Sequence, residues 1–263
     1  MADTEELTPA GRQRFIMNWL AENPSISVAD IVHRFSVSEV TARHDLVALE
    51  SAGKLRRVRG GAVSISRSTA ISYPEERINV QVRAKEAIAT KAASLVNDGD
   101  VIIADIGTTS FYFVKALIEK RNITIITGDL AIANYVSFNL PNATVVLLGG
   151  TLRKGHLYLA GALTLDSMQK LHADKAFVSA DGFSPDQGFT VEHDFSAVIK
   201  KVYLTNSQQQ YMLLDESKFN KTSFYQYSTL EDFTGIIVDS DSEGIMSKAI
   251  EASKQQPTLY IAD

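Results

Sequence analysis

The spacing of apolar residues divides the chain into two regions. Near the amino terminus apolar side chains recur every three or four positions, as at Ala42 and Leu46, which predicts short amphipathic helices. A polar stretch without a period follows, and then a long helix over 75–97 is expected. Beyond it, short continuous apolar runs alternate with helical patterns, which predicts parallel strands covered on both faces. We therefore expect an α/β protein with a small helical domain over 1–65, a linker over 66–75, and an α/β domain with a mostly parallel sheet over 76–263.

Local signals place the ends of the first elements. Thr8–Pro9 suits the start of the first helix, and Trp19 on its apolar stripe is expected in the core. Ser27–Asp30 has the pattern of a capping box for a second helix, and Ser38 is a good N-cap for a third. Gly60–Gly61 is typical of a tight hairpin turn. The amino-terminal region is therefore predicted to hold three helices followed by a hairpin.

The third predicted helix presents a polar face, and the hairpin after it is basic. Thr41, His44 and Asp45 lie on that face, and no acidic residue occurs between Ser51 and Tyr73. A small polar face at a helix start fits the major groove, and clustered cations suit contacts to phosphates. The pattern predicts a winged helix-turn-helix that binds double-stranded operator DNA, although a solvated charged hairpin on a small helical domain would share it. The candidate DNA-binding residues are Ser38, Thr41, Arg43, His44, Lys54, Arg56, Arg57 and Arg59.

Polar or glycine residues follow five of the predicted strands in the second region. Because the carboxyl ends of parallel strands share one edge of a sheet, a ligand is expected there. Gly107 before a helix suits a phosphate held by free helix amides, unless Thr108 or Thr109 merely caps the helix. Lys218 can add a point charge, unless it is simply a solvated lysine. The candidate ligand residues are Asp105, Gly107, Thr108, Thr109, Thr127, Gly149, Gly150, Asp181, Glu192 and Lys218.

Composition and charge narrow the class of protein. Of 263 residues 45% are hydrophobic, none is cysteine, and no apolar run reaches membrane-spanning length. The acidic start of the chain is unlike a signal peptide, so we expect a cytoplasmic protein without a membrane partner. The net charge is −5 overall, but it is +1 up to Tyr73 and −6 beyond. The five histidines show no ligand spacing, so neither a metal nor a cofactor is expected.

The motifs of both regions resemble those of the DeoR family of bacterial transcription regulators. The similar segments are Val37–Leu46, Leu49–Glu50, Gly53–Arg57, Gly60–Ala62, Asp105–Thr109, Leu147–Gly150, Phe177–Gly182 and Asp215–Phe219. The chain departs from the family pattern in several places, among them Ala42 in place of the usual isoleucine and Glu192–Asp194, which is more charged than expected. His44 stands where a second arginine is usual, and Thr127–Asp129 stands where a threonine–asparagine pair is more common. The resemblance implies a winged helix-turn-helix and a sugar-phosphate-sensing domain with the fold of ribose-5-phosphate isomerase.

The resemblance also implies a function. We expect a transcriptional repressor of a carbohydrate-catabolism operon, controlled by a phosphorylated sugar or sugar alcohol, and not an enzyme. Because an operator has two half-sites, a homo-oligomer is expected, either a dimer or a tetramer. Two other interpretations remain. One is a sugar-phosphate isomerase with an appended DNA-binding head, in which Asp105, Asp181 or Glu192 is the general base and Lys218 the phosphate anchor. The other is an architectural DNA-binding protein with a degenerate ligand site.

Overall fold

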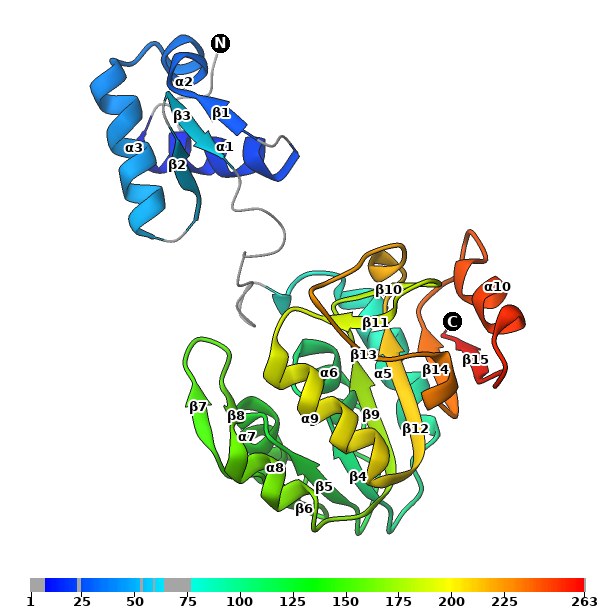
Figure 1. Cartoon of the computed structure of the whole chain (residues 1–263). Coiled ribbons are helices and arrows are strands. Elements are labelled where there is room, and N and C mark those ends of the chain that lie inside the picture. The colour runs from blue at the N-terminus through cyan, green and yellow to red at the C-terminus, as the bar shows by residue number, and fades with distance from the viewer. Residues whose placement is uncertain (1–7, 23–24, 53, 59, 64–76, 263) are drawn as a thin grey trace. The chain divides into compact units, whose positions relative to one another are not determined.

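The computed structural model describes residues 8–22, 25–52, 54–58, 60–63 and 77–262. The chain forms two compact units, 1–71 and 72–263 (Figure 1). The expected linker over 66–75 lies outside the described residues, and so does Arg59. The limits of the predicted domains therefore stay predictions.

The described residues of the first unit form three helices and three short strands. They are α1 (Pro9–Glu22), β1 (Ser25–Ser27), α2 (Val28–Phe35), α3 (Glu39–Ser51), β2 (Arg56–Val58) and β3 (Gly61–Val63). The predicted caps are confirmed: Ser27 and Asp30 form the capping box of α2, and the Ser38 hydroxyl accepts a hydrogen bond from the Thr41 amide at the start of α3. Ile16, Ile31, Leu46 and Leu55 are among the buried side chains that join the helices to the hairpin.

One expectation for the first unit was wrong, and one strand was not predicted. Trp19 was expected in the core, but it is 41% exposed beside the Phe15 ring, whereas Ile16 and Leu20 on the same stripe are buried. Strand β1 had no signal in the sequence. It pairs antiparallel with β3, which in turn pairs with β2, so the hairpin belongs to a three-stranded sheet.

The second unit is a parallel sheet covered on both faces, as the apolar pattern predicted. The elements that form the sheet and its two covering layers are α5 (Val82–Ser94), β4 (Val101–Ala104), α6 (Thr108–Lys115), β5 (Thr124–Thr127), α7 (Leu130–Asn139), β6 (Thr144–Leu147), α8 (Ala162–Met168), β9 (Ala173–Ser179), α9 (Asp194–Thr205), β12 (Ser207–Leu214), β14 (Gly235–Val238), α10 (Ile245–Ala252) and β15 (Thr258–Ile261). Shorter elements are β7 (Thr151–Arg153), β8 (Tyr158–Ala160), β10 (Gly182–Ser184), β11 (Gly188–Val191), β13 (Tyr225–Ser228) and the 3₁₀ turns η1 (Glu216–Lys218) and η2 (Leu230–Asp232).

The order of the strands defines a switch point in the sheet. The seven strands run in the order β15-β14-β12-β9-β4-β5-β6, and every neighbouring pair is parallel. The chain proceeds from β4 outward to β5 and β6, and then returns to β9 on the other side of β4. In open α/β sheets ligands bind at the carboxyl ends of the strands where the order reverses. That point lies between β4 and β9.

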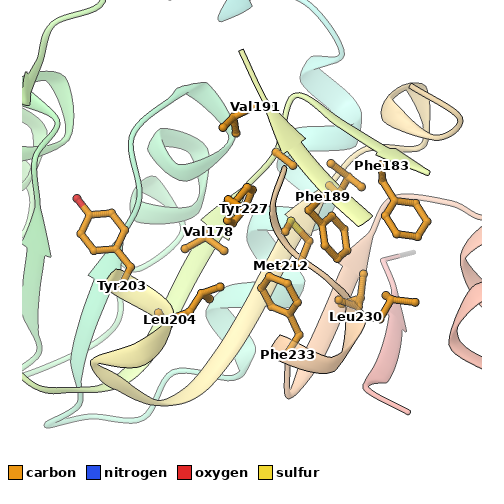
Figure 2. Packing of buried hydrophobic residues seen from close by; sticks show 14 of the residues in the cluster. Val178, Phe183, Phe189, Val191, Tyr203, Leu204, Met212, Tyr227, Leu230 and Phe233 are labelled. Carbon is orange, nitrogen blue, oxygen red and sulfur yellow. The ribbon is translucent and has the colours of Figure 1, made fainter. Parts of the chain in front are cut away.

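Two apolar cores hold the layers together. Helices α5, α6 and α7 cover one face, where Ile88, Phe113 and Val136 pack against the sheet. Helices α8, α9 and α10 cover the other face, together with the small antiparallel sheet β10-β11-β13. Figure 2 shows Phe189 and Tyr227 from that small sheet beside Met212 of β12. The small sheet and the β7–β8 hairpin had no signal in the sequence.

The entry into the second unit also differs from expectation. The long helix predicted over 75–97 is interrupted, because Arg77 is helical, a turn covers 78–81, and α5 begins only at Val82. The helix expected after Gly107 begins at Thr108.

Candidate functional site

The exposed face of α3 is the candidate surface for reading DNA. Arg43 and His44 are exposed, as predicted from the helical spacing, and Thr41 is half-buried next to the Ser38 cap. Two exposed apolar side chains on the same face were not predicted, Val40 and Val47, and Val40 is 78% exposed. These positions are spaced i, i+3, i+4 and i+7, so one face presents two cationic or titratable side chains between two methyl-bearing ones. Such a face suits base edges and thymine methyl groups.

The polar face predicted for α3 requires one correction. Asp45 was expected beside His44, but it is buried and pairs with Arg12 of α1 at 2.7 Å. The Arg12 guanidinium reaches both carboxylate oxygens of Asp45. Asp45 therefore fixes α3 to α1 and is not available to DNA.

The hairpin holds its cations in different ways. The Arg57 guanidinium lies 2.7 Å from Glu50 of α3, and its backbone amide donates to the same carboxylate. These hydrogen bonds lower the pKa of Glu50. Both side chains are exposed enough for the Arg57 guanidinium to face a phosphate as well. Lys54 is exposed, and Arg56 belongs to β2.

In the second unit the five loops named from the sequence follow five neighbouring strands. They follow β12, β9, β4, β5 and β6, which lie side by side in that order. All five strands are parallel, so their carboxyl ends share one edge. The switch point between β4 and β9 lies within this set. The sheet therefore brings the predicted loops together, although it does not expose all of their side chains.

The amino end of α6 is prepared for an anion. Gly107 is its N-cap, with φ 117°, and no side chain caps the helix. An added Cβ on Gly107 would meet no atom within 4 Å, so the space above the loop is open. Thr108 and Thr109 form the first turn, where helix amides lack intrahelical partners. Below them the buried hydroxyl of Ser110 has no hydrogen-bond partner among the described residues. This helix end can hold a phosphate.

Asp105 lies deeper than the sequence suggested. It is fully buried, and one carboxylate oxygen pairs with the Lys200 ammonium of α9 and accepts hydrogen bonds from the Ser179 amide and hydroxyl. The other oxygen, Oδ1, has no partner among the described residues. Asp105 thus joins the loops after β4 and β9 to α9 beneath the edge of the sheet. The sequence had instead predicted that Asp105 contacts the ligand directly.

The loops after β5 and β6 are shaped mainly by packing. The buried Thr127 hydroxyl accepts a hydrogen bond from the Asp129 amide. Asp129 caps α7 and also accepts a hydrogen bond from the Gly107 amide at 3.1 Å, so it joins the β5 loop to the β4 loop. A Cβ on Gly150 would lie 2.3 Å from the Thr164 hydroxyl, whereas Gly149 faces open space. Gly150 is therefore required by packing, which the sequence had left open.

The loops after β9 and β12 carry the charged groups. Asp181 accepts hydrogen bonds from Arg77 and from the Glu192 amide, both at 3.0 Å. Burial opposes ionisation of Asp181, but Arg77 and this amide outweigh it and lower its pKa. Burial and the neighbouring Asp181 raise the pKa of Glu192. Burial, followed by Arg77, lowers the pKa of Lys218, whose ammonium makes no hydrogen bond or ion pair with the described residues.

Sequence reasoning missed Arg77, Lys85 and Lys200 at this edge. Lys200 was hidden in a helical pattern, and Arg77 and Lys85 were assigned to one long helix. Their only signal was an unusual density of cations in segments expected to be solvated helix faces. Elsewhere, a polar cavity of about 300 Å³ lies at the opposite edge of the sheet, next to Gln210 and Thr234. These two side chains already bond to each other, and the cavity contains none of the predicted residues.

Within the described ranges, no cluster of three or more histidine, aspartate or glutamate side chains is arranged to hold a metal ion. In the same ranges, no helix has the length and apolar character needed to cross a membrane.

Comparisons with known proteins match both units. Residues 12–68 match the model of the DeoR-like helix-turn-helix domain, and residues 80–240 match that of the DeoR C-terminal sensor domain. The chain is 35% identical to the HTH-type transcriptional regulator YulB of Bacillus subtilis over 95% of this chain and 96% of that protein. It is 33% identical to the transcriptional repressor GlcR of the same organism, over 85% and 86% of the two chains. The lactose phosphotransferase system repressor of Streptococcus mutans is also 33% identical, over 85% and 89%. A solved structure of ribose 5-phosphate isomerase A from Methanocaldococcus jannaschii matches 51% of this chain and 53% of its own, with 21% identity and a TM-score of 0.38.

Proposed function

Since the chain belongs to the DeoR family of transcription regulators, we propose that it represses a carbohydrate-catabolism operon and responds to a phosphorylated sugar or sugar alcohol. Two relatives support this specific role by their names, one a repressor and one a repressor of a lactose phosphotransferase system. The observation that carries the proposal for the second unit is the uncapped end of α6 beside the switch point of the sheet. An open helix end at that place is suited to a phosphate.

The proposed DNA contacts are of two kinds, contacts to base edges and contacts to phosphates. Base edges are read by the exposed face of α3, through Thr41, Arg43 and His44, with Ser38 at the helix start. Phosphates are held by the cations of the hairpin, which fix position without reading sequence. The proposed phosphate contacts are Lys54, Arg56, Arg57 and Arg59.

The proposed effector contacts follow from which side chains reach the open edge. The phosphate binds the hydroxyls and amides of Thr108 and Thr109 in the open space over Gly107, and Lys218 adds its charge. Sugar hydroxyls bind Asp181 and Glu192. The loops are held in shape by Asp105, Thr127 and Gly150, while Gly149 borders the open space.

The remaining features of the proposal concern partners and chemistry. We propose a homo-oligomer, since exposed leucines gather on β6 and the β7–β8 hairpin, among them Leu147, Leu152 and Leu157. We propose that the protein acts in the cytoplasm, where bacterial DNA lies, and that it is not an enzyme. The engagement of Asp105 by Lys200 supports this last point, because a sealed carboxylate is poorly placed as a general base.

The test has two stages on the full chain. Selection from random double-stranded DNA first yields the preferred operator. Fluorescence anisotropy then measures operator binding with glucose 6-phosphate, fructose 6-phosphate, ribose 5-phosphate and glycerol 3-phosphate, and with the unphosphorylated sugars as controls. We expect one phosphate ester to change operator affinity and its parent sugar to have no effect. Operator binding unaffected by every ester would identify an architectural DNA-binding protein, and conversion of ribose 5-phosphate to a ketose would identify an isomerase.

A further inference from the structure

Arg77 lies where the chain enters the second unit. It is the first described residue after segment 64–76, and it directly precedes the turn over 78–81 that leads into α5. The buried Lys85 ammonium donates hydrogen bonds to the Arg77 carbonyl at 2.5 Å and to the Val80 carbonyl at 2.7 Å. The Tyr112 hydroxyl donates to the Ile78 carbonyl. The backbone of the turn is therefore fixed to α5 and α6, and the Arg77 side chain extends to Asp181 in the loop after β9.

The Arg77 side chain faces a second cation as well as Asp181. Lys218 follows β12, the strand next to β9, and its ammonium has no hydrogen-bonded or ion-paired partner among the described residues. Arg77 and Lys218 are close enough for the arginine to lower the pKa of the lysine, after the larger effect of burial. Lys85 has a pKa lowered to about 8 by burial, with further contributions from Arg77 and Lys218 that Asp215 opposes. Three cations thus converge at the carboxyl edge, and an anion between Arg77 and Lys218 would relieve their repulsion.

We propose that Arg77 binds the anionic group of the effector together with Lys218, and that it leaves Asp181 to do so. This inference rests on the proposed effector site and adds a residue from the amino-terminal entry of the second unit. A guanidinium presents paired donors that match a phosphate, and a phosphate dianion attracts it more strongly than one carboxylate. Asp181 stays satisfied after the exchange, because the Glu192 amide still donates to it. The Arg77 side chain is 39% exposed and so has room to turn.

The exchange defines two states of the protein, one with Arg77 paired to Asp181 and one with Arg77 bound to the effector. A ligand shifts DNA affinity only if it binds one conformation better than another. With Arg77 on Asp181 its guanidinium is held by the loop after β9, and with Arg77 on the effector that loop is released. Arg77 therefore connects occupancy of the site to the first described residues of the second unit.

Inorganic phosphate is the probe for this exchange, because it lacks the hydroxyls that Asp181 would bind in a sugar. Its binding to the full chain is measured by calorimetry for wild type, Arg77→Gln, Arg77→Lys and Asp181→Asn. Arg83→Gln is the matched control, since Arg83 is an exposed arginine on α5. We expect Arg77→Gln to weaken phosphate binding at least about tenfold, and Arg77→Lys to weaken it less. Arg83→Gln should bind as wild type does.

Asp181→Asn should bind phosphate as tightly as wild type or more tightly, because it releases Arg77 and removes a negative charge. If Arg77 only positions Asp181, this variant will instead lose as much affinity as Arg77→Gln, which would overturn the inference. Wild-type affinity in Arg77→Gln would also overturn it. Both results leave the proposed function intact if a sugar phosphate still changes operator binding. Absence of phosphate binding and of any sugar-phosphate response in wild type would overturn both.

Discussion

Two kinds of ion pair occur in this chain, and the second unit places one of each at neighbouring strand ends. The Lys200–Asp105 pair after β4 is sealed, with side chains 4% and 0% exposed. The Arg77–Asp181 pair after β9 is open, with side chains 39% and 30% exposed. The first unit repeats the contrast, with Arg12–Asp45 sealed between helices and Arg57–Glu50 open at the hairpin. Sealed pairs join elements because a buried charge cannot lose its partner cheaply, whereas open pairs can exchange partners.

The sharpest test of this difference removes one carboxylate from each kind of pair. Asp105→Ala leaves the buried Lys200 ammonium unpaired, and we expect it to lower the free energy of unfolding by about 3–5 kcal/mol. Asp181→Asn should change it far less. Urea denaturation of the full chain measures both. Similar losses in the two variants would remove the distinction between sealed and open pairs.

Lys218 extends the comparison to a cation that has no partner among the described residues. Lys218→Ala should weaken binding of the effective sugar phosphate about tenfold, because one charge-assisted hydrogen bond is lost. Operator affinity without effector should stay nearly unchanged. The control is Lys201→Ala, an exposed lysine on α9. Paired titrations of effector into protein and of protein onto operator measure the two quantities. Loss of effector-free DNA binding would give Lys218 a structural role.

The open pair at the hairpin leads to a prediction about salt. Arg57→Ala should weaken operator and random DNA about equally and lower the salt slope of binding by about one unit. The reason is that the exposed Arg57 guanidinium, held by Glu50, is proposed to contact a phosphate. Anisotropy titrations over a range of salt concentrations measure the slope. A much larger loss on the operator than on random DNA would mean that Arg57 reads bases.

On α3, substitution of His44 would add a cation that has no carboxylate partner on the helix, unlike the neighbouring Arg43. His44→Arg should change the operator selected from random DNA or tighten binding to all DNA, while effector affinity stays the same, since His44 is exposed on the reading face. By contrast Arg43 already pairs with Glu39 at 2.8 Å. Recovery of the same site at the same affinity by both proteins would place His44 outside the interface.

The last prediction concerns Lys85 and pH. Its folded-state pKa of about 8 lies below the unfolded value of about 10.4, so the unfolded chain holds more protons between these values. The stability of wild type relative to Lys85→Met should therefore rise as pH increases from about 8 to about 10.4. Urea denaturation over this range measures it, and Lys201→Met serves as the control. A flat difference would mean that Lys85 titrates normally.

Sequence patterns predicted well which face of a helix a residue occupies, but they predicted poorly how deeply a charged side chain is buried. Helical spacing located Ala42, Leu46 and the caps of α2 and α3, because the helix period and the capping hydrogen bonds are local properties. Asp45 was misplaced because its partner Arg12 is distant in the sequence. The strand ends were correctly expected at one edge, since a parallel sheet aligns them regardless of side-chain detail. Whether Asp105 or Asp181 reached the surface depended on Lys200 and Arg77, which no local pattern connects to them.

The strand β1 has a consequence for the span of DNA that α3 and the hairpin of one unit can contact together. Gly61 of β3 passes so close to β1 that an added Cβ would lie 2.2 Å from the Ile26 carbonyl oxygen. The hairpin is thereby bound to the residue pair that precedes α2, and α2 packs on α3 through the same core. Helix α3 and the hairpin are thus held in one core, which sets the distance between them. We therefore expect a change of operator to involve the bases that α3 reads or the spacing between half-sites, and not the span of one half-site.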